Sequence, residues 1–139
     1  MWSLVGGALL CAQQNHSVPV DHFATYPEVD YGEGIEAVQI KRGEYLTKAG
    51  DCIACHTSKD GVAFAGGHPL ETPFGTFYSP NITPDKEHGL GAWSDEDFLR
   101  AMRHGTAPDG SQYYPAFPYV YYNRVSEEDI LAIKAYLDK

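Results

Sequence analysis

The sequence is short of basic residues. Its 139 residues contain 10 Lys and Arg against 19 Asp and Glu, which gives a formal net charge of −9 with His neutral. Affinity for nucleic acid comes from clustered cationic side chains that contact phosphates, so this composition argues against nucleic acid as a partner. We expect partner proteins to approach with basic surfaces instead. The length is that of one ordinary domain with room for a leader or linker.

Cysteine and long apolar runs are scarce too. Three cysteines, an odd number, do not make a disulfide scaffold. The apolar run that opens the sequence has about a dozen residues, whereas a membrane-spanning helix needs roughly 20. We therefore interpret residues 1–14 as a signal segment or a truncated membrane anchor. Cys11 is then an ordinary apolar residue of that segment, or alternatively a site of acylation.

The next segment is polar and lacks a regular period. Residues 15–37 carry Pro19, Pro27 and several acids, and apolar residues recur at neither helical nor strand spacing. We interpret the segment as a linker or as an extended strap that lies over the domain.

Three helical patterns follow. The first covers about residues 38–54 and contains Gly43, which would let another helix approach closely. The second is capped by Ser94 and stops at Gly105, and the third is capped by Ser126 and carries an apolar stripe. About forty residues rich in Gly, Pro, Thr and Asn separate the first two helices. A loop this long in a small domain normally wraps around something.

The sequence Cys52-Ile53-Ala54-Cys55-His56 indicates which group the long loop encloses. Two thiols at this spacing can add to the two vinyl groups of a haem, and the adjacent His then supplies the proximal nitrogen of the iron. The pattern is specific for covalent haem c. A zinc site would need two further ligands at comparable spacing, and no second cysteine pair exists. A thioredoxin-like pair would follow a strand, whereas the residues before the motif have helical period.

The residues around the motif resemble the bacterial class I cytochromes c, in particular the cytochrome subunits of membrane-bound alcohol, aldehyde and gluconate dehydrogenases. The resemblance covers about Arg42 to Leu137 and rests on these segments: Arg42–Leu46, Ala49–Thr57, Gly66–Gly67, Thr72–Asp85, Trp93–Phe98, Arg100–Gly105 and Tyr114–Tyr119. It implies an all-α domain over residues 38–139, with three to five helices and long loops around one covalent haem. Those subunits usually carry three haem modules, whereas this chain has one motif, as in single-haem relatives.

The sixth ligand of the iron departs from the family pattern. Where the dehydrogenase subunits have Tyr-Pro-Ala-Met-Pro-Tyr, this chain has Phe117, which we expect to contact the haem. Met102 is the remaining thioether, on the apolar stripe of a helix that the resemblance places on the distal side, and we predict that it binds the iron. The alternatives are a core methionine that touches the porphyrin without bonding the iron, a His such as His104, or an open site.

Other residues receive roles from the same resemblance. Tyr78, Asn81 and Thr83 stand in the loop that it places along the haem edge, where their polar groups could bind a propionate. They could equally serve only the loop backbone. We also expect a backbone carbonyl to accept the second ring N–H of His56.

The first and last helices of class I cytochromes cross. The resemblance therefore implies that Gly43, Tyr45 and Leu46 pack on the apolar stripe of the third helix.

We therefore predict an electron carrier rather than an enzyme. It would pass single electrons from a dehydrogenase to an oxidase or a cytochrome of the respiratory chain. A haem enzyme or a gas or redox sensor with an open distal site is the alternative, and only Phe117 favours it. Because haem attachment requires reduced thiols and export, we expect the bacterial periplasm, with a tether to the inner membrane as an option.

Overall fold

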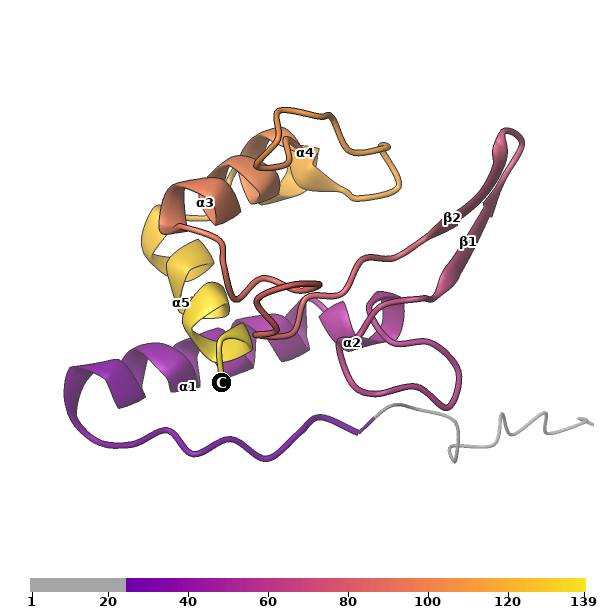
Figure 1. Cartoon of the computed structure of the whole chain (residues 1–139). Coiled ribbons are helices and arrows are strands. Elements are labelled where there is room, and N and C mark those ends of the chain that lie inside the picture. The colour runs from indigo at the N-terminus through magenta and orange to yellow at the C-terminus, as the bar shows by residue number, and fades with distance from the viewer. Residues whose placement is uncertain (1–24) are drawn as a thin grey trace, which may run out of the picture.

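The computed structural model describes residues 25–139, so the predicted leader and residues 15–24 of the predicted strap lie outside the described residues. Within residues 25–139 the chain forms helices and one small sheet (Figure 1). The elements are α1 (Gly34–Ala49), α2 (Cys52–Cys55), β1 (Pro69–Thr72), β2 (Gly75–Tyr78), α3 (Asp95–His104), α4 (Tyr119–Tyr122) and α5 (Glu127–Leu137). The predicted all-α class with long loops is confirmed.

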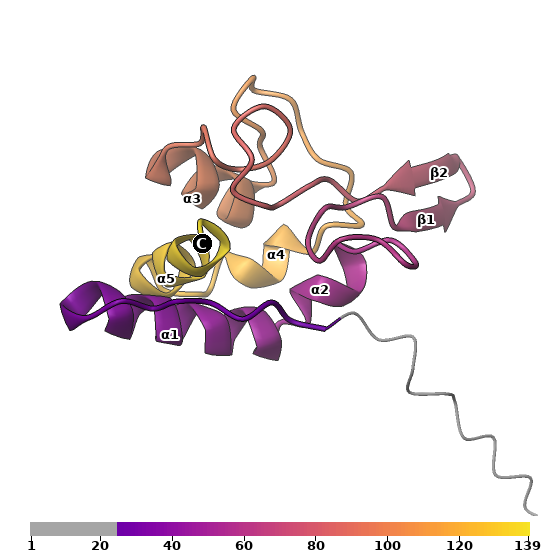
Figure 2. The same ribbon diagram turned by 60° about the horizontal axis from the view of Figure 1, so that its bottom comes forward.

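The core lies where α5 packs across α1 (Figure 2). Gly43 makes the close crossing possible, because a Cβ placed there would lie 1.8 Å from the backbone oxygen of Ala132 and 3.0 Å from the Cβ of Tyr136. Ile40 and Ile130 are fully buried. The predicted role of Gly43 is therefore confirmed. Tyr45 is a different case, because it is 64% exposed and its predicted place in this contact is wrong.

The first helix differs from its predicted bounds of 38–54. It begins at Gly34, so that Ala37, predicted to end the strap, is buried on the helix. It also ends at Ala49, because Gly50 closes the last turn through its N–H to Leu46 O and Asp51 then adopts a left-handed conformation with φ of 50°. Asp tolerates this backbone state better than most side chains. The break lets α2 leave in its own direction and carry the cysteines away from α1.

The caps of the two later helices are confirmed. The Ser94 hydroxyl accepts from Asp97 N–H, and the Asp97 carboxylate accepts from Ser94 N–H, which is a complete capping box at α3. The Ser94 hydroxyl also lies 2.8 Å from the Asp97 carboxylate, and its hydrogen bond, the bond from Ser94 N–H and the nearby Arg100 hold the pKa of Asp97 below its usual range. Gly105 ends α3 with φ of 65°, and Ser126 accepts from Asp129 N–H at the start of α5.

Replacing Ser94 with Ala should destabilise the protein by about 1 kcal/mol, because the N–H of Asp97 loses its acceptor and the reciprocal bond weakens. Thermal unfolding of the holoprotein measures the change. Ser111→Ala is a useful comparison, since Ser111 also bonds a nearby carboxylate, that of Asp109, but lies in an exposed loop outside any helix. Equal effects of the two substitutions would contradict the role of the cap.

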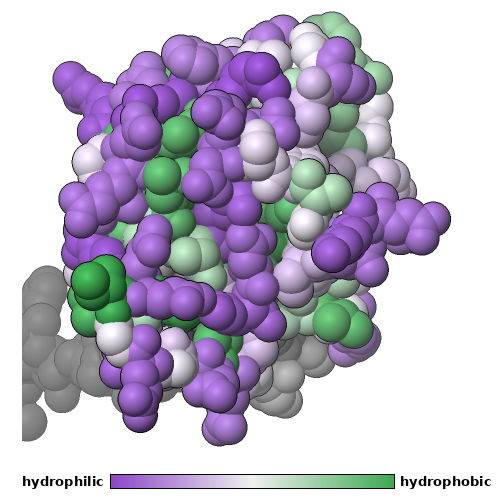
Figure 3. All heavy atoms as spheres, turned by 60° about the vertical axis from the view of Figure 1, so that its left-hand side comes forward, coloured by the Kyte–Doolittle hydropathy of each residue, from purple (hydrophilic) through white to green (hydrophobic). Residues whose placement is uncertain are grey.

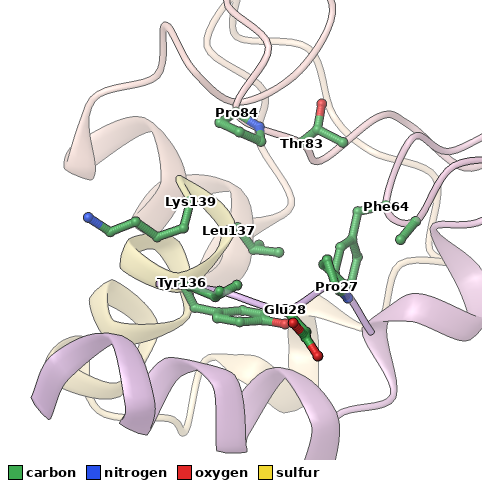
Figure 4. A pocket seen from close by; sticks show the side chains of 10 residues that line it. Pro27, Glu28, Phe64, Thr83, Pro84, Tyr136, Leu137 and Lys139 are labelled. Carbon is green, nitrogen blue, oxygen red and sulfur yellow. The ribbon is translucent and has the colours of Figure 1, made fainter. Parts of the chain in front are cut away.

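Residues 25–33 are extended and run along α1 and α5 (Figure 2). The Tyr31 hydroxyl donates to the Glu44 carboxylate of α1, and the Tyr26 ring meets Phe64 edge-on at 5.8 Å. A small cavity of about 140 Å³ remains between this segment, Phe64 and Tyr136 (Figure 4).

A β-hairpin projects from the helical body (Figure 1). The sequence predicts a loop for these residues. Its strands β1 and β2 are antiparallel, with Leu70 opposite Phe77 and Thr72 opposite Gly75. Each strand has four residues, and all eight are half-buried or exposed. The Phe77 ring stacks on Tyr114 at 4.1 Å, which ties the hairpin to the loop between α3 and α4.

Candidate haem site

The site begins with the single helical turn α2. Cys52 and Cys55 stand three positions apart at its two ends, which places their side chains on the same side of the turn. Ile53 between them is buried and fixes the turn to the core. Both cysteines are free thiols. The arrangement thus presents two reduced sulfurs together, beside His56.

Burial keeps the first thiol protonated. Burial, with smaller contributions from the neighbouring Asp51 and Cys55, raises the pKa of Cys52 to about 11. A thiol with this pKa is neutral at physiological pH and is a weak nucleophile. Cys52 is therefore poorly suited to thiol–disulfide exchange, which agrees with the exclusion of a thioredoxin-like pair.

His56 is held in one orientation by a backbone carbonyl. Its Nδ1 lies 2.9 Å from the oxygen of Pro80. A carbonyl can only accept, so Nδ1 carries the proton and Nε2 keeps its lone pair. Burial lowers the pKa of His56, which favours the neutral ring, although the bond to Pro80 acts in the opposite direction. The side chain therefore offers Nε2 as a metal ligand, and Pro80 is the carbonyl that the sequence led us to expect without naming it.

Gly66 allows Pro80 to approach His56. A Cβ at Gly66 would lie 2.5 Å from the carbonyl carbon of Pro80 and 2.6 Å from Ser79 O, and its φ is 76°. The N–H of Gly66 also donates to His56 O. Only glycine satisfies both the space and the backbone angle at this point.

The residues proposed for the distal side differ in how deeply they are buried. Met102 is 8% exposed and belongs to the buried apolar cluster, on the face of α3 that also carries Phe98. His104 is exposed at the end of the same helix. Phe117 is half-buried in the loop before α4. No described contact joins Met102 or His104 to His56, and the sixth ligand stays a prediction.

Phe117 belongs to an aromatic cluster beside the cysteines. Its ring stacks on Tyr122 at 5.7 Å and meets Tyr113 edge-on at 6.0 Å. Burial raises the pKa of Tyr122, and the nearby sulfurs of Cys52 and Cys55 add to the effect. Phe117 is thus linked through Tyr122 to the cysteines. The sequence does not predict the place of Tyr122 in this cluster, because nothing in the chain around it distinguishes it from Tyr119 and Tyr121.

The three polar loop residues have different surroundings. The Asn81 side-chain oxygen accepts from both the N–H and the hydroxyl of Thr83, at 2.8 and 2.7 Å. Thr83 also borders the small cavity of Figure 4. Tyr78 lies at the end of β2 and is 67% exposed. The bonds between Asn81 and Thr83 serve the loop itself, and a contact of the three residues with a propionate stays a prediction.

The chain's own residues fit a covalently bound haem. Two free thiols share one helical turn, and a neutral imidazole of fixed tautomer follows them with Nε2 available. The small cavity is a different place, since none of its lining residues belongs to the motif. Over residues 25–139 no three His, Cys, Asp or Glu side chains gather closely enough to hold a metal ion by themselves. The class of protein that this site defines is one that carries haem c.

Comparison with known proteins identifies the family. The family model described as "Cytochrome c" matches residues 40–139. The cytochrome c subunit of gluconate 2-dehydrogenase from Pantoea cypripedii is 58% identical over 97 residues, which are 70% of this chain and 22% of that protein. The cytochrome c subunit of a quinone-dependent alcohol dehydrogenase from Gluconobacter oxydans (strain 621H) is 47% identical over 106 residues, which are 76% of this chain and 22% of that protein. A protein named "Diheme cytochrome c-type" from Cereibacter sphaeroides is 45% identical over 105 residues, which are 72% of this chain and 36% of that protein.

The chain belongs to the cytochrome c family, which implies covalently bound haem c and a role in electron transfer. It spans about a fifth of the length of the first two relatives. In the part of the chain that the structure describes, no helix is both long enough and apolar enough to cross a lipid bilayer.

Proposed function

We propose that the chain carries one haem c and passes single electrons from a dehydrogenase to the respiratory chain or a terminal oxidase, without being an enzyme itself. The observation that carries the proposal is the pairing of the Cys52–His56 motif with the Pro80 carbonyl. That bond leaves Nε2 of His56 free to bind iron. The haem supplies the one-electron chemistry, and the chain's residues hold it, orient it and limit its exposure to water.

The number of haems and the electron donor are inferred from the motif count and from the relatives. One C-x-x-C-H motif in the 139 residues supports one haem, although one relative is named as a diheme protein. The two dehydrogenase subunits among the relatives support a dehydrogenase as the electron donor. An oxidase or another cytochrome is the proposed acceptor.

We place the folded domain in the bacterial periplasm. Reduced thiols and export machinery are required for haem attachment, and the apolar residues 1–14 suit a signal segment or an inner-membrane anchor. Residues 15–33 would then connect that segment to α1, which begins at Gly34. Holoprotein recovered in the cytoplasmic fraction would contradict this location.

Met102 is the proposed sixth ligand, and replacing it with Leu tests the assignment. Leu has a similar volume, so the core should lose less than about 1.5 kcal/mol of stability while the sulfur disappears. If Met102 binds iron, the sulfur-to-iron absorption band of the oxidised protein should vanish and the reduction potential should fall. An unchanged low-spin spectrum without that band in either protein would show that a histidine is the ligand, with His104 the first to replace.

Phe117 supports a second candidate, a haem enzyme or sensor with an open distal site. An aromatic ring cannot bond the iron, and Phe117 stands where the family pattern has methionine. A high-spin wild type that binds carbon monoxide on reduction would favour this second candidate. A low-spin protein that ignores carbon monoxide and shows a reversible one-electron couple would support the carrier.

A further inference from the structure

The β1–β2 hairpin exposes aromatic side chains that nothing in the described chain covers. Phe74 in its turn is 84% exposed, and Tyr78 at the end of β2 is 67% exposed. Figure 1 shows the hairpin projecting beyond the helices. Exposed aromatic residues grouped on one element are typical of interaction sites, because they bury much apolar area on contact. We call Phe74 and Tyr78 the hairpin surface.

The hairpin is held firmly enough to serve as a docking element. Phe77 stacks on Tyr114, and the Thr72 hydroxyl bonds Gly75 O at 2.8 Å across the turn. At the base, Ser79 bonds His68 through both backbone and side chain. A preorganised surface loses little conformational entropy when a partner binds.

The surroundings of the hairpin are almost free of charge. With His counted as neutral, residues 61–84 contain one charged residue, Glu71, and residues 104–123 contain one, Asp109; His68 and His104 also lie in these two ranges. These two segments contribute −2 to the net charge of −9, and the rest of the chain contributes −7. Acids crowd the first turns of α3 and α5, and the side of the molecule that Figure 3 brings forward is largely hydrophilic.

A short covalent path joins this surface to the haem ligand. Tyr78 is followed by Ser79 and Pro80, and the Pro80 carbonyl accepts the hydrogen bond from His56 Nδ1 at 2.9 Å. Two peptide bonds and one hydrogen bond thus separate the hairpin surface from the imidazole proposed to bind the iron. A protein docked here would lie next to the redox site.

We propose that the hairpin surface docks a second redox protein or domain whose own face is apolar and uncharged. The uncharged surroundings select this occupant, because a cluster of charges on the partner would lose water and find only Glu71 opposite it. In the docked pair one electron is lost by the donor's redox centre and gained by the acceptor's, and no bond or proton on this chain changes. The proposal rests on the electron-transfer function proposed above and narrows its partner. It also differs from the basic partner surface expected from net charge alone.

The test compares two single variants of the holoprotein on coated gold electrodes. One coating is an uncharged alkanethiol monolayer with methyl and hydroxyl ends, and the other has amine ends. The first variant, Phe74→Ser, removes the exposed ring at the tip of the hairpin surface and leaves Tyr78, a predicted haem contact, in place. The control, Ile35→Ser, removes an apolar side chain of α1 that is 89% exposed. Binding is measured by microbalance, and the electron-transfer rate is measured by voltammetry.

We expect the wild type to bind the uncharged monolayer with an affinity that changes less than about twofold as salt rises from roughly 10 mM to 0.5 M. The hairpin variant should bind about tenfold more weakly or worse and exchange electrons more slowly, while the control stays within about twofold. Thermal unfolding should be the same for both variants, since Phe74 and Ile35 are both exposed.

Three results would overturn the proposal. The two variants could weaken binding equally, or the wild type could bind and exchange electrons better on the amine-ended monolayer. Sedimentation could also show a wild-type dimer that the hairpin variant lacks, in which case a second copy of the chain is the occupant. Binding that depends on the hairpin without any electron exchange would leave the docking surface intact and contradict the proposed electron-transfer function.

Discussion

A protein in which Cys52 and Cys55 are both replaced with Ala should carry no haem after denaturation. Each thiol forms one thioether, so the double variant has no covalent link to the cofactor. The free thiols on one turn of α2 are the chemical basis of this expectation. Denaturing electrophoresis followed by haem staining measures it, and the expected loss is complete.

The single variants and Cys11 sharpen this test. Cys52→Ala and Cys55→Ala should each retain some covalent haem through the remaining thioether. Cys11→Ala should retain all of it, because Cys11 lies outside the motif. Covalent haem in the double variant would disprove the assignment of the motif, and so would its loss in Cys11→Ala alone.

Gly43→Ala should destabilise the holoprotein by about 3 kcal/mol or more, a large part of the roughly 5–15 kcal/mol that stabilise a typical domain. The added methyl would meet the Ala132 backbone oxygen at 1.8 Å. A backbone atom in the middle of α5 cannot move aside as a flexible side chain can. The helices must therefore separate, and the apolar contact between them is lost.

The sign of the change in stability distinguishes a glycine at a close helix crossing from a glycine on an exposed helix surface. In an exposed helix, Gly→Ala stabilises by about 0.5–1 kcal/mol. Gln39→Ala, at an exposed position of α1, serves as the control and should change the melting temperature little. A Gly43→Ala protein that melts at or above the wild-type temperature would show that the helices do not cross closely at this point.

Local side-chain chemistry explains which parts of the fold the sequence predicts correctly. Ser94, Gly105 and Ser126 mark helix ends through bonds or backbone angles within a few residues, and the structure has the ends where they were expected. The break at Asp51 depends on one left-handed backbone angle, for which aspartate gives no distinctive signal. The sequence does not predict the hairpin, because its short strands are mostly solvent-exposed and show no alternation of apolar and polar residues.

The residues of the site also fall into those that the local sequence predicts and those that it does not. Cys52, Cys55 and His56 are contiguous, and their spacing alone states the chemistry. Pro80 stands 24 residues from His56, and its contact depends on the path of the loop through Gly66, which no local pattern encodes. Tyr122 reaches the cysteines only because α4 folds back toward α2. The sequence predicts the residue types of the site, but it does not predict the contacts between segments that are distant along the chain.

The crossing of α1 and α5 also sets the order of events as the protein is made. Arg42 and Asp129, which pair across this crossing, are 87 residues apart, and Glu36 pairs with Lys139 across 103. A chain that emerges from its N-terminus cannot bury the contact face of α1 until its last helix has arrived. Cys52 and Cys55 thus remain on an incomplete fold for most of that time. The fold thereby provides an interval in which the thiols are accessible to the enzymes that attach the haem, before α5 closes the domain.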